Sequence, residues 1–247
     1  MSRWQLLGLT LGVYALGLAA TAPASLIDAG LEQASEGRLR LTDTRGTLWS
    51  GTGHFEMRDR MQRTAVATSI AWRLLPQFLL RGQLRCEVVL DQAAKHFPVT
   101  ISPSQIEVTD ADINLPASAL GVVEPKLAPL GLTGDMLLHV ARLALGRKSI
   151  DGNATLQWRG AGSAYTKVSP LGDYELRLEG EGTTARASLR TLQGALQLDG
   201  QGSWTSGGKP AFLGSARIAP EQRQQLAPLM RMFAVERGDG SFELQLK

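Results

Sequence analysis

Apolar and polar residues alternate with a period of two through most of the chain beyond residue 38. The alternation is clearest in RLRLTDT, TSIAWRL, LRCEVVLD and DYELRLEGEG, which begin at residues 38, 68, 84 and 173. Successive side chains of a β-strand point to opposite faces, so this period predicts strands with one apolar and one polar face. Glycine-containing turns separate many of the runs. The sequence therefore predicts a mainly β fold: an elongated, largely antiparallel sheet, open as a groove or half-barrel, with a few short helices.

The last third of the chain separates the two faces most clearly. We expect one face to carry large apolar residues, namely Leu156, Trp158, Leu176, Leu178, Leu196, Leu198, Leu244 and Leu246. We expect the opposite face to carry charged and amide side chains, namely Glu175, Arg177, Glu179, Gln197, Glu243 and Gln245. One face of the predicted sheet is therefore apolar and the other is in contact with water.

A few segments interrupt or blur the alternation. SLIDAGLEQASEG predicts a short helix with Ser25 as its N-terminal cap. Residues 115–131 contain three prolines and predict two short helical turns, because proline interrupts a helix. Residues 220–235 predict an amphipathic helix, kinked at Pro228, that covers the open edge or the apolar face of the sheet. Residues 135–152 fit both a helix and a pair of strands, and we favour strands.

The N-terminus holds the longest apolar run. Residues 4–22, WQLLGLTLGVYALGLAATA, contain no charged side chain and as a helix would be about 28 Å long, close to the thickness of a bilayer's hydrocarbon core. A cleavable signal peptide is the alternative, because APA at residues 22–24 offers small residues for cleavage after a short positive region. We favour an uncleaved transmembrane helix, because the run exceeds the usual apolar core of a signal peptide. We therefore expect residues 1–27 to form a membrane anchor and residues 28–247 a β-rich domain.

Charge and cysteine content narrow the classes of partner and of stabilising bond. The formal net charge is +3, and lysines and arginines are scattered among acidic residues, so we expect no nucleic-acid partner. The single cysteine, Cys86, cannot form an intramolecular disulfide. Its place in the alternation predicts a small, buried, apolar side chain.

No motif supplies a catalytic or metal site. His54, His96 and His139 lie in different segments without the spacing of metal ligands. Neither Ser50 nor Ser163 lies in the Gly-x-Ser-x-Gly pattern of a serine hydrolase. GEGTTA has the spacing of a phosphate-binding turn, but the strand-like ARASLRTL follows it and favours a hairpin. We therefore expect no catalytic, cofactor-binding or metal-binding residue, and a protein that is not an enzyme.

Four stretches follow the apolar N-terminal segment in a fixed order: RGTLWSGTG, AWRLLPQFLLRGQL, SPLGDYELRLEG and LQGALQLDGQGSW. This ordered set resembles protein N of the bacterial type II secretion system over nearly the whole chain. The resemblance implies an accessory component, anchored in the inner membrane by a single pass, with its C-terminal domain in the periplasm, that supports export of folded proteins across the outer membrane. The implied partners are the inner membrane and other inner-membrane subunits of that system.

The family in turn resembles AsmA-like proteins, whose repeated strands form an open groove with an apolar inner face. That resemblance implies an alternative function, the binding or transfer of lipid in the periplasm. The family has no catalytic residues that could be assigned to this chain. Its motif positions are structural or contact candidates here: Gly46, Leu48, Trp49, Gly51, Leu171, Gly172, Asp173 and Tyr174.

Overall fold

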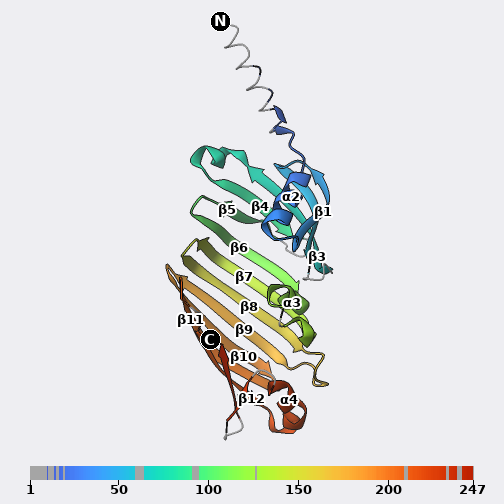
Figure 1. Cartoon of the computed structure of the whole chain (residues 1–247), viewed down its shortest axis with the longest axis vertical. Coiled ribbons are helices and arrows are strands. Elements are labelled where there is room, and N and C mark those ends of the chain that lie inside the picture. Colours follow the sequence, from blue (N-terminus) through green and yellow to red (C-terminus); the bar gives the residue numbers. More distant parts are fainter. Residues whose placement is uncertain are drawn as a thin grey trace.

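The strands form one continuous, open sheet. The computed structural model describes Thr10, Tyr14, Gly17, Leu18 and residues 20–58, 64–90, 95–125, 127–208, 211–231, 234–237 and 241–246. In this part of the chain, 14 strands pair in sequence order except that β14 lies between β12 and β13. Consecutive strands cross the long axis of the molecule one after another (Figure 1). The predicted mainly β, open, antiparallel sheet is therefore confirmed.

The elements have the following bounds. The strands are β1 (Leu39–Gly46), β2 (Ser50–Arg58), β3 (Thr64–Leu75), β4 (Leu84–Leu90), β5 (Phe97–Ile101), β6 (Gln105–Pro116), β7 (Thr133–Gly146), β8 (Ile150–Gly162), β9 (Gly172–Glu181), β10 (Thr184–Gly194), β11 (Leu196–Thr205), β12 (Ala211–Ile218), β13 (Val235–Glu236) and β14 (Phe242–Leu246). The helices and 3₁₀ turns are α2 (Ser25–Ala34), η1 (Pro76–Arg81), η2 (Ala117–Ala119), α3 (Leu120–Val123), η3 (Ala128–Leu130), η4 (Pro220–Gln222) and α4 (Arg223–Met230).

The ambiguous and interrupted segments resolve as expected, with two corrections. Residues 135–152 lie in strands β7 and β8, and residues 115–131 contain only short helical turns after β6. The helix predicted for residues 220–235 is confirmed over its first part, as η4 followed by α4 with Pro228 inside it, but α4 ends at Met230 and Val235 belongs to β13. The predicted Ser25 cap is wrong, because the cap position is Ala24 and no side chain bonds there. Pairing of Pro23 with Thr47 holds the chain just before the helix, and the first turn bonds to backbone carbonyls instead.

One face of the sheet is apolar from end to end. Residues that pair directly across antiparallel strands point to the same side, so the register defines each face. On what we call the inner face, Trp72 pairs with Val88, and Leu156 pairs with Leu176, as the predicted leucine rows require. Leu198 continues this face next to Ala216 near the C-terminal end. The opposite, outer face carries most of the charged side chains.

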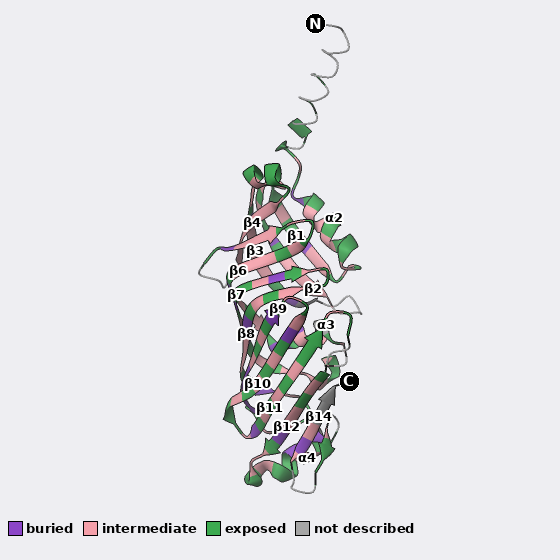
Figure 2. Ribbon diagram, turned by 90° about the vertical axis from the view of Figure 1, so that its left-hand side faces the viewer, coloured by how far each residue is buried: buried purple, intermediate pink, exposed green. Residues whose placement is uncertain are grey.

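Short helices cover the inner face at three places. Near the N-terminus, Ala24 and α2 pack on Leu41 and Trp72. In the middle, η2 packs between Val66 of β3 and Met136 of β7, so the sheet curls around this cluster. At the C-terminal end, α4 covers the face through Leu226 and Met230. The three helical segments lie along one side of the twisted sheet (Figure 2). The core is thus a chain of small clusters along the sheet.

The predicted anchor lies largely outside the described residues. Of residues 4–22, the structure describes Thr10, Tyr14, Gly17, Leu18 and residues 20–22. Within the described part of the chain, none of the helices combines the length and the apolar character that a membrane span requires.

Candidate functional site

The RGTLWSGTG segment forms the tight turn between β1 and β2. Thr47 N donates to Ser50 O at 2.9 Å and closes the turn. Gly46 has a φ of 96°, and a Cβ at this position would lie 2.5 Å from Ser50 O. A Cβ at Gly51 would lie 2.6 Å from the Trp72 ring. Both glycines are therefore required by backbone conformation and close packing.

The tip of this turn is bonded to two other parts of the chain. Leu48 N donates to Ala22 O at 2.8 Å, and the indole nitrogen of Trp72 donates to Leu48 O at 3.2 Å. Leu74 N donates to Trp49 O at 2.7 Å. The side chains of Leu48 and Trp49 are half-buried. The tip of the β1–β2 turn therefore connects the chain just before α2, at Ala22, with the end of β3, at Leu74.

The second group of candidate residues, 171–174, fastens β9 to its neighbours. Leu171 is buried in the C-terminal cluster, and its backbone NH donates to Ala161 O at 2.7 Å. Gly172 lies so close to β10 that an added Cβ would be 2.7 Å from Gln193 O. The Asp173 carboxylate accepts hydrogen bonds from Gly160 N at 2.7 Å and from the Gln193 amide at 2.6 Å. These hydrogen bonds lower the pKa of Asp173.

Tyr174 extends this fastening to β11. Its side chain is buried, and its hydroxyl donates to Leu196 O at 2.9 Å. The Trp158 ring packs beside it at a centroid distance of 5.9 Å. Burial raises the pKa of Tyr174, so the phenol stays protonated and donates throughout the physiological pH range. The role of residues 171–174 is therefore to hold strands together.

The two groups of candidates do not form one site. Gly46, Leu48, Trp49 and Gly51 lie at the β1–β2 turn, whereas Leu171, Gly172, Asp173 and Tyr174 lie at and just before β9, in the other half of the sheet (Figure 1). No bond joins the two groups in the described part of the chain. Each group stabilises the sheet locally.

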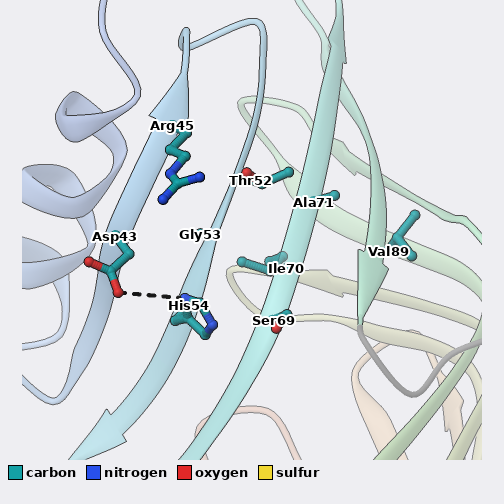
Figure 3. A pocket seen from close by; sticks show the side chains of 9 residues that line it. All are labelled: Asp43, Arg45, Thr52, Gly53, His54, Ser69, Ile70, Ala71 and Val89. Carbon is teal, nitrogen blue, oxygen red and sulfur yellow. Dashed lines mark ion pairs between the residues drawn. The ribbon is translucent and has the colours of Figure 1, made fainter.

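The outer face of β1–β4 is hollowed beside the first group. A shallow hollow of about 400 Å³ is lined by Asp43, Arg45, Thr52, Gly53, His54, Ser69, Ile70, Ala71 and Val89 (Figure 3). A second hollow of about 310 Å³ shares Thr52, Ala71 and Val89 with it and continues toward His96. Small side chains on the twisted strands leave this space open. Sequence reasoning did not identify it, because the alternating pattern does not show where a sheet bends.

This hollow brings together the residue types of a Ser-His-Asp triad without its geometry. His54 pairs with Ser69 across β2 and β3, and Asp43 lies on the other side of His54. The carboxylate lies 3.9 Å from His54 Nδ1, which is too long for a hydrogen bond. The side chains of His54 and Asp43 are 54% and 82% exposed, whereas a triad base is held by a buried carboxylate. Within the described residues, His54 makes no hydrogen bond to Ser69. The arrangement is that of a solvated surface.

Other titratable residues are accounted for in the same way. His139 Nδ1 lies 2.6 Å from a carboxylate oxygen of Asp112 on the exposed outer face. Over the described ranges, no group of three His, Cys, Asp or Glu residues could hold a metal ion. Cys86, which the alternation predicted to be buried, is only half-buried and packs against the cluster around Trp72. Its partial burial raises the thiol pKa, which favours the unreactive thiol.

Among the residues that the structure describes, Glu175 is the one buried charged residue, and the alternating pattern did not predict its burial. It lies on the expected outer face yet is only 4% exposed. Its carboxylate accepts hydrogen bonds from Arg177 at 2.8 Å, Arg190 at 2.9 Å and Gln157 at 3.3 Å. Although burial by itself raises the pKa of Glu175, the hydrogen bonds and positive charges lower it overall. Arg177 lies two residues away on the same strand, and the register of β8, β9 and β10 brings Gln157 and Arg190 to the carboxylate from the neighbouring strands.

Comparison with known proteins agrees with the ordered motifs. A family model for type II secretion system protein N matches residues 37–245, which run from just before β1 into β14. No curated protein and no solved structure matches the chain, so the resemblance to AsmA-like proteins has no support from a match. The match covers the open sheet with both groups of candidate residues. The chain therefore belongs to the family of type II secretion system protein N.

Proposed function

We propose that this protein is a non-enzymatic accessory component of the type II secretion system that supports export of folded proteins across the outer membrane. The family match over residues 37–245 carries the proposal. The partners that follow from it are other inner-membrane subunits of the same system. The open sheet suits such a role, because it presents two long faces to other proteins.

Anchoring in the inner membrane is the second part of the proposal. Residues 4–22 contain no charged side chain and are long enough, as a helix, to span a bilayer. The domain of residues 28–247 would then lie in the periplasm, where secretion subunits meet their folded cargo. An alkaline phosphatase fused after residue 247 should be active, because this enzyme requires the periplasm to fold. Inactive fusions of full length would contradict the orientation.

The absence of an enzymatic role is supported by the chemistry of the surface. In the described part of the chain, the only grouping of Ser, His and Asp that we find on one strand surface is exposed and lacks the bonds of a triad. The buried carboxylate of Glu175 is occupied by two arginines and an amide. Both arrangements favour a structural rather than a catalytic use of these residues.

Gene deletion with complementation tests the proposal. Removing the gene should lower the amount of exoprotein in the medium or the level of other secretion subunits, and the full chain should restore it. A Leu7→Arg/Leu9→Arg variant places two charges in the apolar run, so it should fail to restore export if anchoring is required. Unchanged export and unchanged subunit levels in the deletion strain, under every condition tested, would refute the proposed function.

Lipid binding by the inner face is a second candidate function. The apolar rows continue across the strands, and Leu176, Leu189, Leu198 and Phe212 on this face remain only half-buried. A long, partly uncovered apolar surface of this kind favours a ligand with an acyl chain. Native mass spectrometry of the purified full chain should then show bound phospholipid. A spectrum with no bound lipid would contradict this alternative and leave the secretion role untouched.

A further inference from the structure

The turn between β3 and β4 exposes two leucines side by side. In η1, Leu80 is 94% exposed and Leu79 is 44% exposed. Full exposure of a large apolar side chain next to a second one is unfavourable in water and is typical of a surface that meets an apolar partner. Leu80 is the most exposed large apolar residue of the described part of the chain.

The turn holds these leucines in a defined position. Pro76 begins it, and Gly82 ends it with a φ of 68°, a conformation that glycine adopts readily. Gly82 N donates to Leu79 O at 2.9 Å, and Gln83 N donates to Phe78 O at 3.1 Å. The exposure of Leu79 and Leu80 is therefore a property of a closed, capped turn.

Two arginines flank the turn, and the first acidic residue after it in the sequence is Glu87. The guanidinium carbons of Arg81 and Arg85 lie 6.0 Å and 5.1 Å from the centre of the Phe78 ring. Neither arginine forms an ion pair with a described residue. Residues 64–86 contain no Asp or Glu, and neither do residues 44–53, which form the adjacent β1–β2 turn. The combination of exposed leucines with unpaired arginines fits the interface of a membrane rich in anionic lipid.

The turn lies at the end of the body where the apolar N-terminal segment enters. Ala22 O accepts a hydrogen bond from Leu48 N, and Trp49 O accepts one from Leu74 N, two residues before η1. Two backbone bonds therefore connect the end of the predicted membrane span to the start of the turn. Figure 1 shows η1 as the teal turn between β3 and β4 at the upper end of the body, the end that carries residues 20–24.

From this placement we infer that η1 is a second membrane contact, in which Leu79 and Leu80 enter the interface of an anionic bilayer while Arg81 and Arg85 bind lipid phosphates. The inference rests on the proposed anchoring in the inner membrane. Its consequence is geometric: two attachment points at one end fix the long axis of the sheet relative to the bilayer. Half-buried Trp49, on the neighbouring turn, lies at the same end, and tryptophan favours the headgroup region.

A depth measurement on the full chain tests this contact. The single cysteine is first replaced by Cys86→Ala, and an environment-sensitive fluorophore is then attached to Leu80→Cys. The matched control is Leu213→Cys, an exposed leucine on β12 near the opposite end of the sheet. Both proteins are reconstituted with vesicles of phosphatidylcholine and phosphatidylglycerol that contain brominated lipid. We expect blue-shifted, quenched emission from position 80 and unshifted, unquenched emission from position 213.

Each outcome of the experiment decides the matter. If the chain floats with the vesicles but the emission at position 80 is as unshifted and unquenched as at position 213, the η1 contact is overturned and the proposed anchor is retained. Failure of the chain to float at all would overturn both. Equal quenching at both positions would show unspecific lipid binding and would also overturn the contact. Arg81→Gln should reduce the preference of the position-80 signal for vesicles with phosphatidylglycerol over phosphatidylcholine alone, and an unchanged preference would contradict the role of the cation.

Discussion

The buried carboxylate of Glu175 provides the sharpest test of how the middle of the sheet is held together. Glu175→Gln keeps the size of the side chain and removes its charge. The variant loses charge-assisted hydrogen bonds from Arg177 at 2.8 Å and from Arg190 at 2.9 Å. Gln157 remains as a possible partner of the new amide. The substitution therefore isolates the ionic part of the cluster.

The structure sets the size of the effect. Bonds to charged groups each contribute about 1.5–3 kcal/mol when well shielded from water. The Glu175 side chain is 5% exposed, but those of Arg177 and Arg190 are 51% and 54% exposed, so solvent screens the cluster and hydrates the arginines of the variant. We therefore expect Glu175→Gln to lower the free energy of unfolding by about 1–2 kcal/mol in total.

The pH dependence has a defined sign. The pKa of Glu175 in the folded protein lies below its usual value of 4.5. Its stabilising contribution is therefore fully present above the unfolded pKa and is lost as the pH falls through the folded pKa. The difference in stability between the natural protein and Glu175→Gln should be constant near neutral pH and should shrink below about pH 4.5.

Urea denaturation of the full chain, followed by tryptophan fluorescence, measures both effects. Trp158 lies beside Tyr174, next to the cluster, and reports on this part of the sheet. Glu179→Gln is the matched control, because Glu179 lies on the same strand and outer face but is exposed. It should change stability by less than about 0.5 kcal/mol. Equal stability of the two variants, or a gap that does not shrink in acid, would refute the reasoning.

Three further substitutions test other parts of the structure. Leu226 of α4 is fully buried against the inner face, so Leu226→Ala should lower the free energy of unfolding, measured by thermal denaturation, by about 2–5 kcal/mol. A loss below about 1 kcal/mol would mean that α4 does not cover the inner face. Gly51→Ala places a Cβ against the Trp72 ring and the Arg45 carbonyl, so the melting temperature should fall, and an unchanged value would contradict the close approach. Trp49→Ala should lower stability or the recovery of secretion subunits in pull-down experiments, and normal values of both would disprove a structural or contact role.

The strands and the apolar face were predictable because they depend on local alternation. Each strand carries its own period of two, whatever its neighbours are, and leucine rows such as Leu156 and Leu176 follow directly from it. The helical alternative for residues 135–152 could be excluded only by pairing. As strands, Leu138 and Val140 meet Ile113 and Ala111 on one side, and a helix would leave those residues without partners.

The sequence indicated where the candidate residues lie in the chain, but it did not indicate which residues they contact. The glycines of RGTLWSGTG indicate a turn, and the structure adds that Leu48 bonds to Ala22 and to the Trp72 indole. The Ser25 cap failed because pairing of Pro23 with Thr47, a contact between distant residues, fixes the helix start instead. Local cap rules take no account of such contacts.

By itself, the sequence determined the class of fold, the apolar N-terminal run and the family to which the chain belongs, because all three are written in local order and spacing. Only the tertiary structure decided which residues meet. Strand register brings Arg190 and Gln157 to the buried carboxylate of Glu175, and the path of the chain brings η1 beside the turn that holds Trp49. These are relations between residues far apart in sequence, and a periodic pattern contains no information about the distance between its own segments in space.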